Sequence, residues 1–215
     1  MLAMTETAFT RAEIESARKL FAGEWRFVAG AGSAVSLPPM QAVEIAFAGR
    51  SNVGKSSLIN ALTNRTALAR VSRTPGRTRE INFFRVNDAF LLVDLPGYGY
   101  ARVAKERRSE WRPLIEGYLR SSPQLRGLVL LLDSRRDPAD DDRAMLDYLA
   151  EGGIPVLVAI TKMDKLGTKA GDDRVAAIAA DLELDPAQVV PVSARTGAGR
   201  DELAAALMDL VGREA

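Results

Sequence analysis

A glycine-rich stretch carries a lysine and two serines at a spacing that suits phosphate binding. Residues 49–57 read Gly-Arg-Ser-Asn-Val-Gly-Lys-Ser-Ser and fit the pattern G-x-x-x-x-G-K-[ST]. Gly49 and Gly54 let the backbone turn tightly, so that its N–H groups approach anionic oxygens. The Lys55 ammonium suits the β- and γ-phosphates of a nucleotide, and the Ser56 hydroxyl suits Mg²⁺. A chance glycine-rich turn is the alternative.

The segments on either side of this loop favour the phosphate-binding interpretation. Apolar residues 43–48 predict a strand that leads into the loop, and residues 57–62 predict the helix that follows it. The motif requires this strand–loop–helix context. Alone, the loop leaves ATPases, GTPases and nucleotide kinases open.

Residues 94–97, Asp-Leu-Pro-Gly, come at the end of a second predicted strand, where ligands bind in parallel sheets. The Asp94 carboxylate is suited to hold Mg²⁺, directly or through water, and the Gly97 N–H to contact a γ-phosphate. Taken alone, this sequence is more often a plain turn.

Two further motifs point to guanine. Thr161-Lys162-Met163-Asp164 follows a predicted strand, and a carboxylate at Asp164 accepts hydrogen bonds from N1–H and the exocyclic amine of guanine, donors that adenine lacks. The Lys162 stem is long enough to lie along the base. Ser193-Ala194-Arg195 follows the last strand, and its small residues would let a backbone N–H reach guanine O6. Each is an ordinary loop if taken alone, but all four motifs in this order indicate a guanine-nucleotide site.

The composition excludes several other chemistries. The 215 residues contain no cysteine and no histidine, so disulfides, zinc–thiolate sites and a histidine general base are excluded. Catalysis must use Lys, Ser, Thr, carboxylates, backbone N–H groups and a bound ion. No apolar run approaches 18 residues and no secretory signal is evident, so we expect a cytoplasmic protein without a membrane span.

Charge is unevenly distributed along the chain. The net charge is +1, but residues 65–126 hold 13 Lys or Arg against 6 Asp or Glu, and residues 127–215 hold 10 against 17. This asymmetry suggests an anionic partner for the middle third. A basic surface that is merely solvated is the alternative.

The remaining elements predict a doubly wound α/β domain with a mostly parallel sheet and one antiparallel edge hairpin. Thr10 and Glu13 have capping-box spacing and begin a helix that runs to about Phe21. Residues 23–40 read as an extended connection, in which Trp25 and Phe27 dock against the body. We therefore divide the chain into an N-terminal helix and connection, 1–42, and a nucleotide-binding domain, 43–212.

Residues 80–86 and 89–93 predict the hairpin, and residues 103–120 a charged helix. Strands at 127–132, 154–160 and 189–192 then alternate with helices that end near 150, 182 and 211. Asp137 and Pro138 read as the N-cap and first residue of the helix that ends near 150.

Several of these segments together resemble a known family. The chain resembles the EngB (YihA/YsxC) family of bacterial ribosome-biogenesis GTPases, within the translation-factor-related P-loop GTPases. The segments that carry the resemblance are residues 47–60, 74–78, 81–84, 94–101 and 161–164. The resemblance covers roughly residues 10 to 212 and implies a Ras-like fold. It also implies a molecular switch in assembly of the large ribosomal subunit, with links to cell division and septation.

The resemblance identifies Thr78 as the switch I threonine, which serves Mg²⁺ and the γ-phosphate; spacing alone does not separate it from Thr66 or Thr74. The implied metal ligands are Ser56, Thr78 and Asp94, and the implied catalytic residues are Lys55, Thr78 and Asn52. The expected nucleotide-binding residues are Gly49, Arg50, Ser51, Asn52, Val53, Gly54, Lys55, Ser56, Ser57, Gly76, Arg77, Thr78, Arg79, Glu80, Asp94, Leu95, Pro96, Gly97, Thr161, Lys162, Met163, Asp164, Val192, Ser193 and Ala194. Thr161 stands where many GTPases have asparagine, which leaves its bond to the loop in doubt.

Tyr98 occupies the position at which Ras-like enzymes use a glutamine to orient the attacking water. A tyrosine cannot orient water as an amide does, so slow intrinsic hydrolysis is expected. A partner or a monovalent cation is then needed, and Asn52 resembles the asparagine that helps to hold K⁺ in potassium-activated relatives.

Arginines and lysines flank both expected switches, at 70, 73, 77 and 79 and at 102, 105, 107 and 108. A basic surface of this kind suits RNA phosphates, and the resemblance implies large-subunit ribosomal RNA as the partner. These arginines would otherwise pair with carboxylates such as Glu106 and Glu110. We expect a monomer that binds neither DNA nor membrane. The alternatives are a GTP-dependent module for a protein partner and, with less support, a nucleotide kinase.

Overall fold

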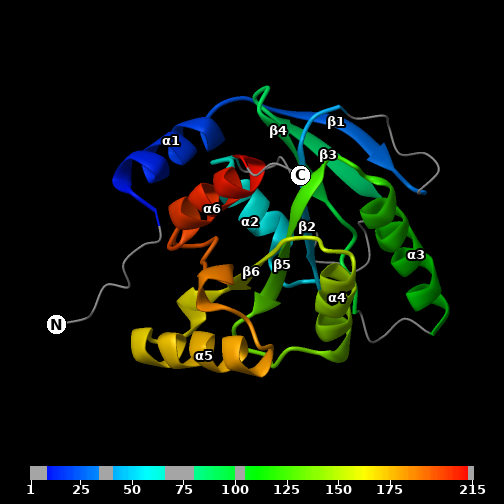
Figure 1. Ribbon diagram of the computed structural model, residues 1–215. Helices are drawn as coiled ribbons and strands as arrows, with labels where there is room; N and C mark the ends of the chain where they lie inside the picture. Colours follow the sequence, from blue (N-terminus) through cyan, green and yellow to red (C-terminus); the bar gives the residue numbers. More distant parts are fainter. Residues whose placement is uncertain (1–8, 34–40, 66–79, 100–104, 213–215) are drawn as a thin grey trace.

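The computed structural model describes residues 9–33, 41–65, 80–99 and 105–212, with side chains from residue 112 onward in the helix that begins at Lys105. Helices cover both faces of a central sheet (Figure 1), which confirms the predicted doubly wound α/β class. Across these ranges, no helix combines the length and apolar character that a bilayer span needs.

Seven strands form the sheet in the order β1-β3-β4-β2-β5-β6-β7. The four strands β2, β5, β6 and β7 run parallel beside β4, whereas β3 is antiparallel to both of its neighbours. The strand bounds are β1 Trp25–Ala31, β2 Glu44–Gly49, β3 Ile81–Val86, β4 Phe90–Asp94, β5 Leu125–Asp133, β6 Val156–Thr161 and β7 Val189–Pro191. The carboxyl ends of β2, β4, β5, β6 and β7 therefore meet at one edge of the sheet, and the four sequence motifs follow β2, β4, β6 and β7.

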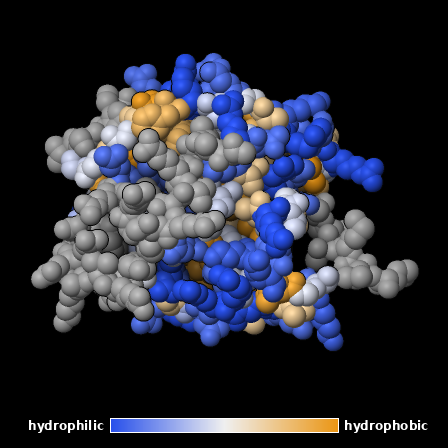
Figure 2. All heavy atoms as spheres, turned by 180° about the vertical axis from the view of Figure 1, so that it is seen from behind, coloured by the Kyte–Doolittle hydropathy of each residue, from blue (hydrophilic) through white to orange (hydrophobic). Residues whose placement is uncertain are grey.

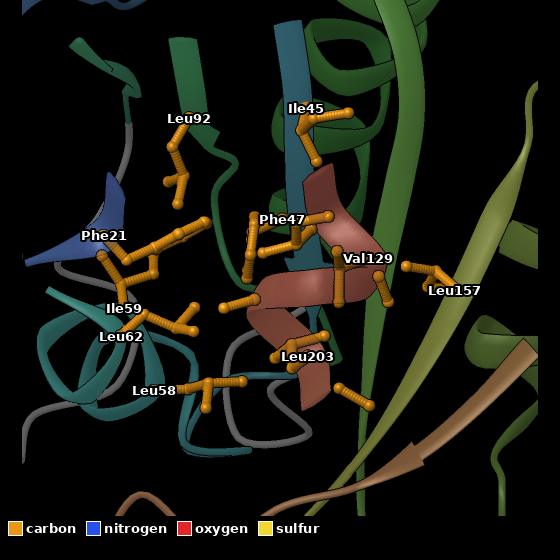
Figure 3. Close-up of a cluster of buried hydrophobic side chains, with 14 of the residues drawn as sticks. Phe21, Ile45, Phe47, Leu58, Ile59, Leu62, Leu92, Val129, Leu157 and Leu203 are labelled. Carbon is orange, nitrogen blue, oxygen red and sulfur yellow. The ribbon is translucent and has the colours of Figure 1, made fainter. Parts of the chain in front are cut away.

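Three helices bury their apolar residues on one face of the sheet. They are α1 Arg11–Phe21, α2 Lys55–Leu62 and α6 Arg200–Gly212. Side chains such as Phe21, Leu58 and Leu203 converge on Phe47 and Val129 of the central strands (Figure 3). The face is closed because α1 packs against α6.

Three other helices cover the opposite face. They are α3 Lys105–Ser121, α4 Asp140–Glu151 and α5 Thr168–Asp181, and their buried residues include Tyr118, Leu149 and Ile178. Two apolar layers therefore lie on either side of the central strands β2, β4, β5 and β6, whose residues are mostly buried, as parallel strands require.

The N-terminal region differs from its predicted form. Residues 25–31, expected to lie within a connection, form strand β1, which pairs with β3 and lies outside the predicted hairpin. The predicted capping box is confirmed, since the Thr10 N–H donates to Glu13 and the Glu13 N–H donates to the Thr10 hydroxyl. Helix α1 is docked through Ala17 and Phe21.

The two aromatic residues of β1 have different outcomes. Trp25 is buried, as predicted, and its indole donates to the Phe21 carbonyl. Phe27 was predicted to dock, and its ring does contact the buried ring of Phe84 edge-on, but the residue is still 55% exposed because β1 is the outermost strand of the sheet. Among the coloured residues in Figure 2, hydrophilic ones dominate, with small hydrophobic patches between them.

The predicted start of α4 is wrong by about two residues. The helix begins at Asp140 with Ala139 as its N-cap, so Asp137 and Pro138 precede it. Asp142, in the first turn, accepts a hydrogen bond from the Ala139 N–H. The carboxylate that satisfies a backbone donor at the start of this helix is therefore Asp142 and not Asp137, as had been expected. Asp137 instead pairs with Arg174 of α5.

Candidate functional site

The phosphate-binding loop joins β2 to α2. It turns through Asn52 and Gly54, both with left-handed backbone at φ 66° and 111°. Gly54 is the N-cap of α2 and has no side chain with which to satisfy the first-turn N–H groups of the helix. These groups and the positive end of the helix dipole suit an anion, so the loop has the geometry of a phosphate site.

Lys55 and Asp94 form a buried ion pair beneath this loop. The Lys55 Nζ donates to Asp94 Oδ1, and both side chains are less than a tenth exposed. Asp94 reaches this place because β4 pairs with β2, opposite Phe47. A phosphate and a cation would compete for these two partners, which is the exchange that a nucleotide site requires.

The oxygen donors nearby fit Mg²⁺ rather than a transition metal. Ser56 lies in the first turn of α2 and Asp94 at the end of β4, so a hydroxyl and one carboxylate are available. Within the described ranges, no three residues from Asp, Glu, His and Cys cluster to hold a metal. This donor set suits a cation that takes its remaining ligands from phosphate and water.

The segment after Asp94 lies directly against the phosphate loop. Ser51 Oγ donates to the Gly97 carbonyl at 3.2 Å, and the Ser51 N–H donates to the Tyr98 carbonyl at 2.8 Å. A Cβ on Gly97 would meet Ser51 Cα at 3.2 Å, so only glycine allows this approach without a shift. Leu95 and Pro96 are buried behind it.

The Tyr98 side chain is directed toward α4 and not toward the phosphate-binding face of the loop. Its ring is buried and its hydroxyl donates to Asp142 Oδ1 of α4 at 2.8 Å. Burial, followed by the nearby Asp142, raises the pKa of Tyr98 well above its ordinary value. Sequence reasoning missed Asp142, which lies 44 residues further along the chain; its place three residues after the N-cap was the only available signal.

The base-reading motif is tied to the phosphate loop by two side chains. Thr161 Oγ1 lies 2.7 Å from the Val53 carbonyl oxygen and 3.0 Å from that of Leu132, so its single hydrogen is within donating distance of the loop, which resolves the doubt about this bond. The Lys162 Nζ donates to the Asn52 carbonyl at 2.6 Å. These bonds fix the position of the base-reading motif relative to the phosphate loop.

Asp164 lines a pocket of about 360 Å³ together with Lys162, Val192 and Ala194. Ser193 Oγ donates to Asp164 Oδ1 at 2.8 Å, whereas Asp164 Oδ2 is buried without a hydrogen bond. The Ser193 bond, outweighing burial, lowers the pKa of Asp164, so the carboxylate is ionised and able to accept. A purine carrying two adjacent donors would satisfy it.

The other predicted residues are placed as follows. Met163 donates its N–H to the Val192 carbonyl at 3.3 Å, which brings the two base-side loops together. Glu80 is exposed just before β3. Gly76, Arg77, Thr78 and Arg79 lie outside the described residues, as do Thr66 and Thr74. Two of the expected catalytic residues, Lys55 and Asn52, belong to the same loop and the helix start that follows it. Two of the expected metal ligands also come from neighbouring elements, since Ser56 lies in the first turn of α2 and Asp94 ends β4, which pairs with β2.

The fold and this arrangement define a P-loop GTPase. A family profile described as "50S ribosome-binding GTPase" matches residues 44–162. The "Probable GTP-binding protein EngB" of Gemmatimonas aurantiaca is 63% identical over 81% of this chain and 85% of that one. Its counterpart from Rhodopseudomonas palustris (strain TIE-1) is 46% identical over 92% and 94%.

Solved structures agree with this assignment. The crystal structure of a probable GTP-binding protein engB matches with a TM-score of 0.66 and 26% identity, covering 79% of this chain and 98% of that chain. The chain therefore belongs to the EngB family of GTP-binding proteins, and it hydrolyses GTP. The family resemblance predicted from the sequence is confirmed.

Proposed function

We propose that this GTPase is a slow molecular switch that acts in assembly of the large ribosomal subunit in the cytoplasm and that depends on Mg²⁺. The observation that carries the proposal is the match of residues 44–162 to a family described as binding the 50S ribosome. Links to cell division and septation belong to the same proposal and would follow from a shortage of ribosomes.

Mg²⁺ would be held by Ser56 and Asp94 and would neutralise charge on the phosphates. Lys55 would leave Asp94 to bind the β- and γ-phosphates, and Thr78 would complete the metal's ligands. Support comes from the donor types and from the buried ion pair between Lys55 and Asp94. Slow turnover is supported by Tyr98, whose hydroxyl is engaged by Asp142.

Potassium is proposed as the ion that compensates for the missing glutamine. Asn52 carries this idea, since it is exposed in the phosphate loop and has a left-handed backbone. The test is GTP turnover in K⁺ against Na⁺ at equal ionic strength. We expect faster turnover in K⁺, and equal rates would refute the role of this ion.

The proposed partner is the large ribosomal subunit or its RNA, bound by a monomer. The basic middle third of the chain supports an anionic partner. The switch arginines named from the sequence lie outside the described side chains, so the support rests on charge and on the family's description.

Co-sedimentation with purified large-subunit particles tests this proposal. Binding should be stronger with a non-hydrolysable GTP analogue than with GDP and should weaken steeply with salt, because phosphate contacts release counterions. Small-subunit particles are the matched control. Binding that ignores the nucleotide, or retention of a protein partner instead of ribosomal particles, would favour the GTP-dependent protein-binding alternative.

A further inference from the structure

Lys162 is held from two sides at the junction of the phosphate loop and the base pocket. Its Nζ donates to the Asn52 carbonyl at 2.6 Å and to Asp133 Oδ2 at 2.8 Å. Its side chain lines the pocket that contains Asp164 and also a second pocket behind the phosphate loop. A lysine has a flexible stem, so two fixed acceptors are needed to define where that stem lies.

Asp133 is built to be one of these acceptors. It is the last residue of β5, and its side chain is 8% exposed. Arg135 binds it through Nε at 2.9 Å and Nη2 at 2.8 Å, and the Arg135 N–H adds a third bond at 3.1 Å. Burial would raise the pKa of Asp133, but the bonds from Arg135 and Lys162 together lower it well below its ordinary value.

Hydrogen bonds of the backbone around Lys162 hold its main chain but do not position its ammonium group. Lys162 itself has a left-handed backbone at φ 62°, and its carbonyl accepts from Ser134 Oγ at 3.3 Å. The Ser134 N–H donates to the Thr161 carbonyl at 3.1 Å. The end of β5 therefore holds the main chain of the base-reading loop, and Asp133 alone among these residues reaches the charged end of Lys162.

We propose that Asp133 is a positioning residue for guanine-nucleotide binding: it holds the Lys162 ammonium against the phosphate loop, so that the lysine stem forms a fixed wall of the base pocket. The proposal rests on guanine-nucleotide binding by the family and is independent of the ribosomal role. Asp133 acts through Lys162, so its loss should weaken binding of GDP and GTP alike and leave the chemical step nearly unchanged.

The first test is the variant Asp133→Asn in the full-length chain. Titration with a fluorescent GDP analogue should show a dissociation constant raised about ten-fold, the scale of a lost hydrogen bond between charged groups. Turnover at saturating GTP should stay within about two-fold, so the effect appears in KM. Asp137→Asn is the matched control, because it makes the same chemical change at an exposed carboxylate in the same loop.

A double-mutant cycle separates positioning from a general structural effect. In a Lys162→Met background, Asp133→Asn should change the dissociation constant by less than about two-fold, since the group it positions is absent. An undiminished ten-fold loss in that background would overturn the proposal, as would an unaltered affinity of the single variant.

Asp133→Glu keeps the charge and provides a second variant if Asp133→Asn does not fold. We expect its affinity to stay within about three-fold of the parent, because a carboxylate remains within reach of Lys162 and Arg135. A loss for the glutamate variant as large as for Lys162→Met would contradict the proposal.

Discussion

Tyr98 is joined to Asp142 across 44 residues of sequence by a hydrogen bond of 2.8 Å from its hydroxyl to Oδ1. Asp142 Oδ2 meanwhile accepts from the Ala139 N–H at the start of α4. One carboxylate thus joins the segment that follows Asp94 to the first turn of a helix on the sheet's outer face. Movement of Tyr98 during the nucleotide cycle would break this buried hydrogen bond and would therefore change the contacts of α4.

Removal of this hydroxyl should affect stability more than chemistry. In Tyr98→Phe, Asp142 loses a donor inside the protein, and we expect a cost of about 1–3 kcal/mol in the free energy of unfolding. Single-turnover hydrolysis should change by less than about three-fold, because the hydroxyl is not available to orient water. Tyr148→Phe, which loses a bond to the Glu116 carbonyl at a partly buried place, is the control and should cost less. A large loss of hydrolysis at unchanged stability would assign Tyr98 a catalytic role.

Lys55→Met should destabilise the nucleotide-free protein as well as abolish GTP binding. The change leaves the Asp94 carboxylate buried without its cation, and removal of one member of a buried pair costs about 3–5 kcal/mol. Urea unfolding without nucleotide measures this cost. The double variant Lys55→Met/Asp94→Asn should recover part of it, since no unpaired charge remains. Equal stabilities of the parent and Lys55→Met would show that the pair contributes nothing.

Asp133 should make stability depend on pH on the acid side. Its pKa is lowered from an ordinary value of 3.8, so the folded protein binds fewer protons there than the unfolded chain. Its stabilisation is therefore complete well above 3.8 and is lost as the pH falls through the lowered pKa. Unfolding measured at several pH values should show the parent's advantage over Asp133→Asn shrinking on acidification. If the stability difference between the parent and Asp133→Asn instead grew on acidification, the lowered pKa of Asp133 would be contradicted.

The motifs on strand ends were predictable because their spacing and setting are local. The motifs Gly49–Ser57, Asp94 and Thr161–Asp164 lie at the carboxyl ends of β2, β4 and β6, at the same edge of the sheet, as the alternating strand–helix pattern required. Thr161 could not be judged from sequence, since its partner Val53 lies 108 residues away. The guanine-reading role of Asp164 was predicted from residue type alone, and its partner Ser193, 29 residues away, appears only in the fold.

Other features depend on pairings that no local pattern encodes. Residues 23–40 were interpreted as a connection because they contain Gly30, Gly32, Pro38 and Pro39, and only the pairing with β3 makes residues 25–31 a strand. Phe27 has the residue type of a core position, but it lies on the outermost strand of the sheet, where contact with Phe84 still leaves it 55% exposed. Asp133 and Asp142 look like ordinary loop and helix carboxylates, and their roles appear only with Lys162 and Tyr98 beside them.

The central claim is that Asp164 selects guanine, and base preference measures it most directly. Asp164→Asn exchanges one acceptor oxygen for an N–H donor, so competition binding should show affinity for GTP reduced at least about ten-fold and affinity for xanthosine triphosphate increased. Asp172→Asn, which makes the same chemical change at an exposed carboxylate of α5, is the matched control. Preserved preference for GTP over xanthosine triphosphate in Asp164→Asn would contradict the account.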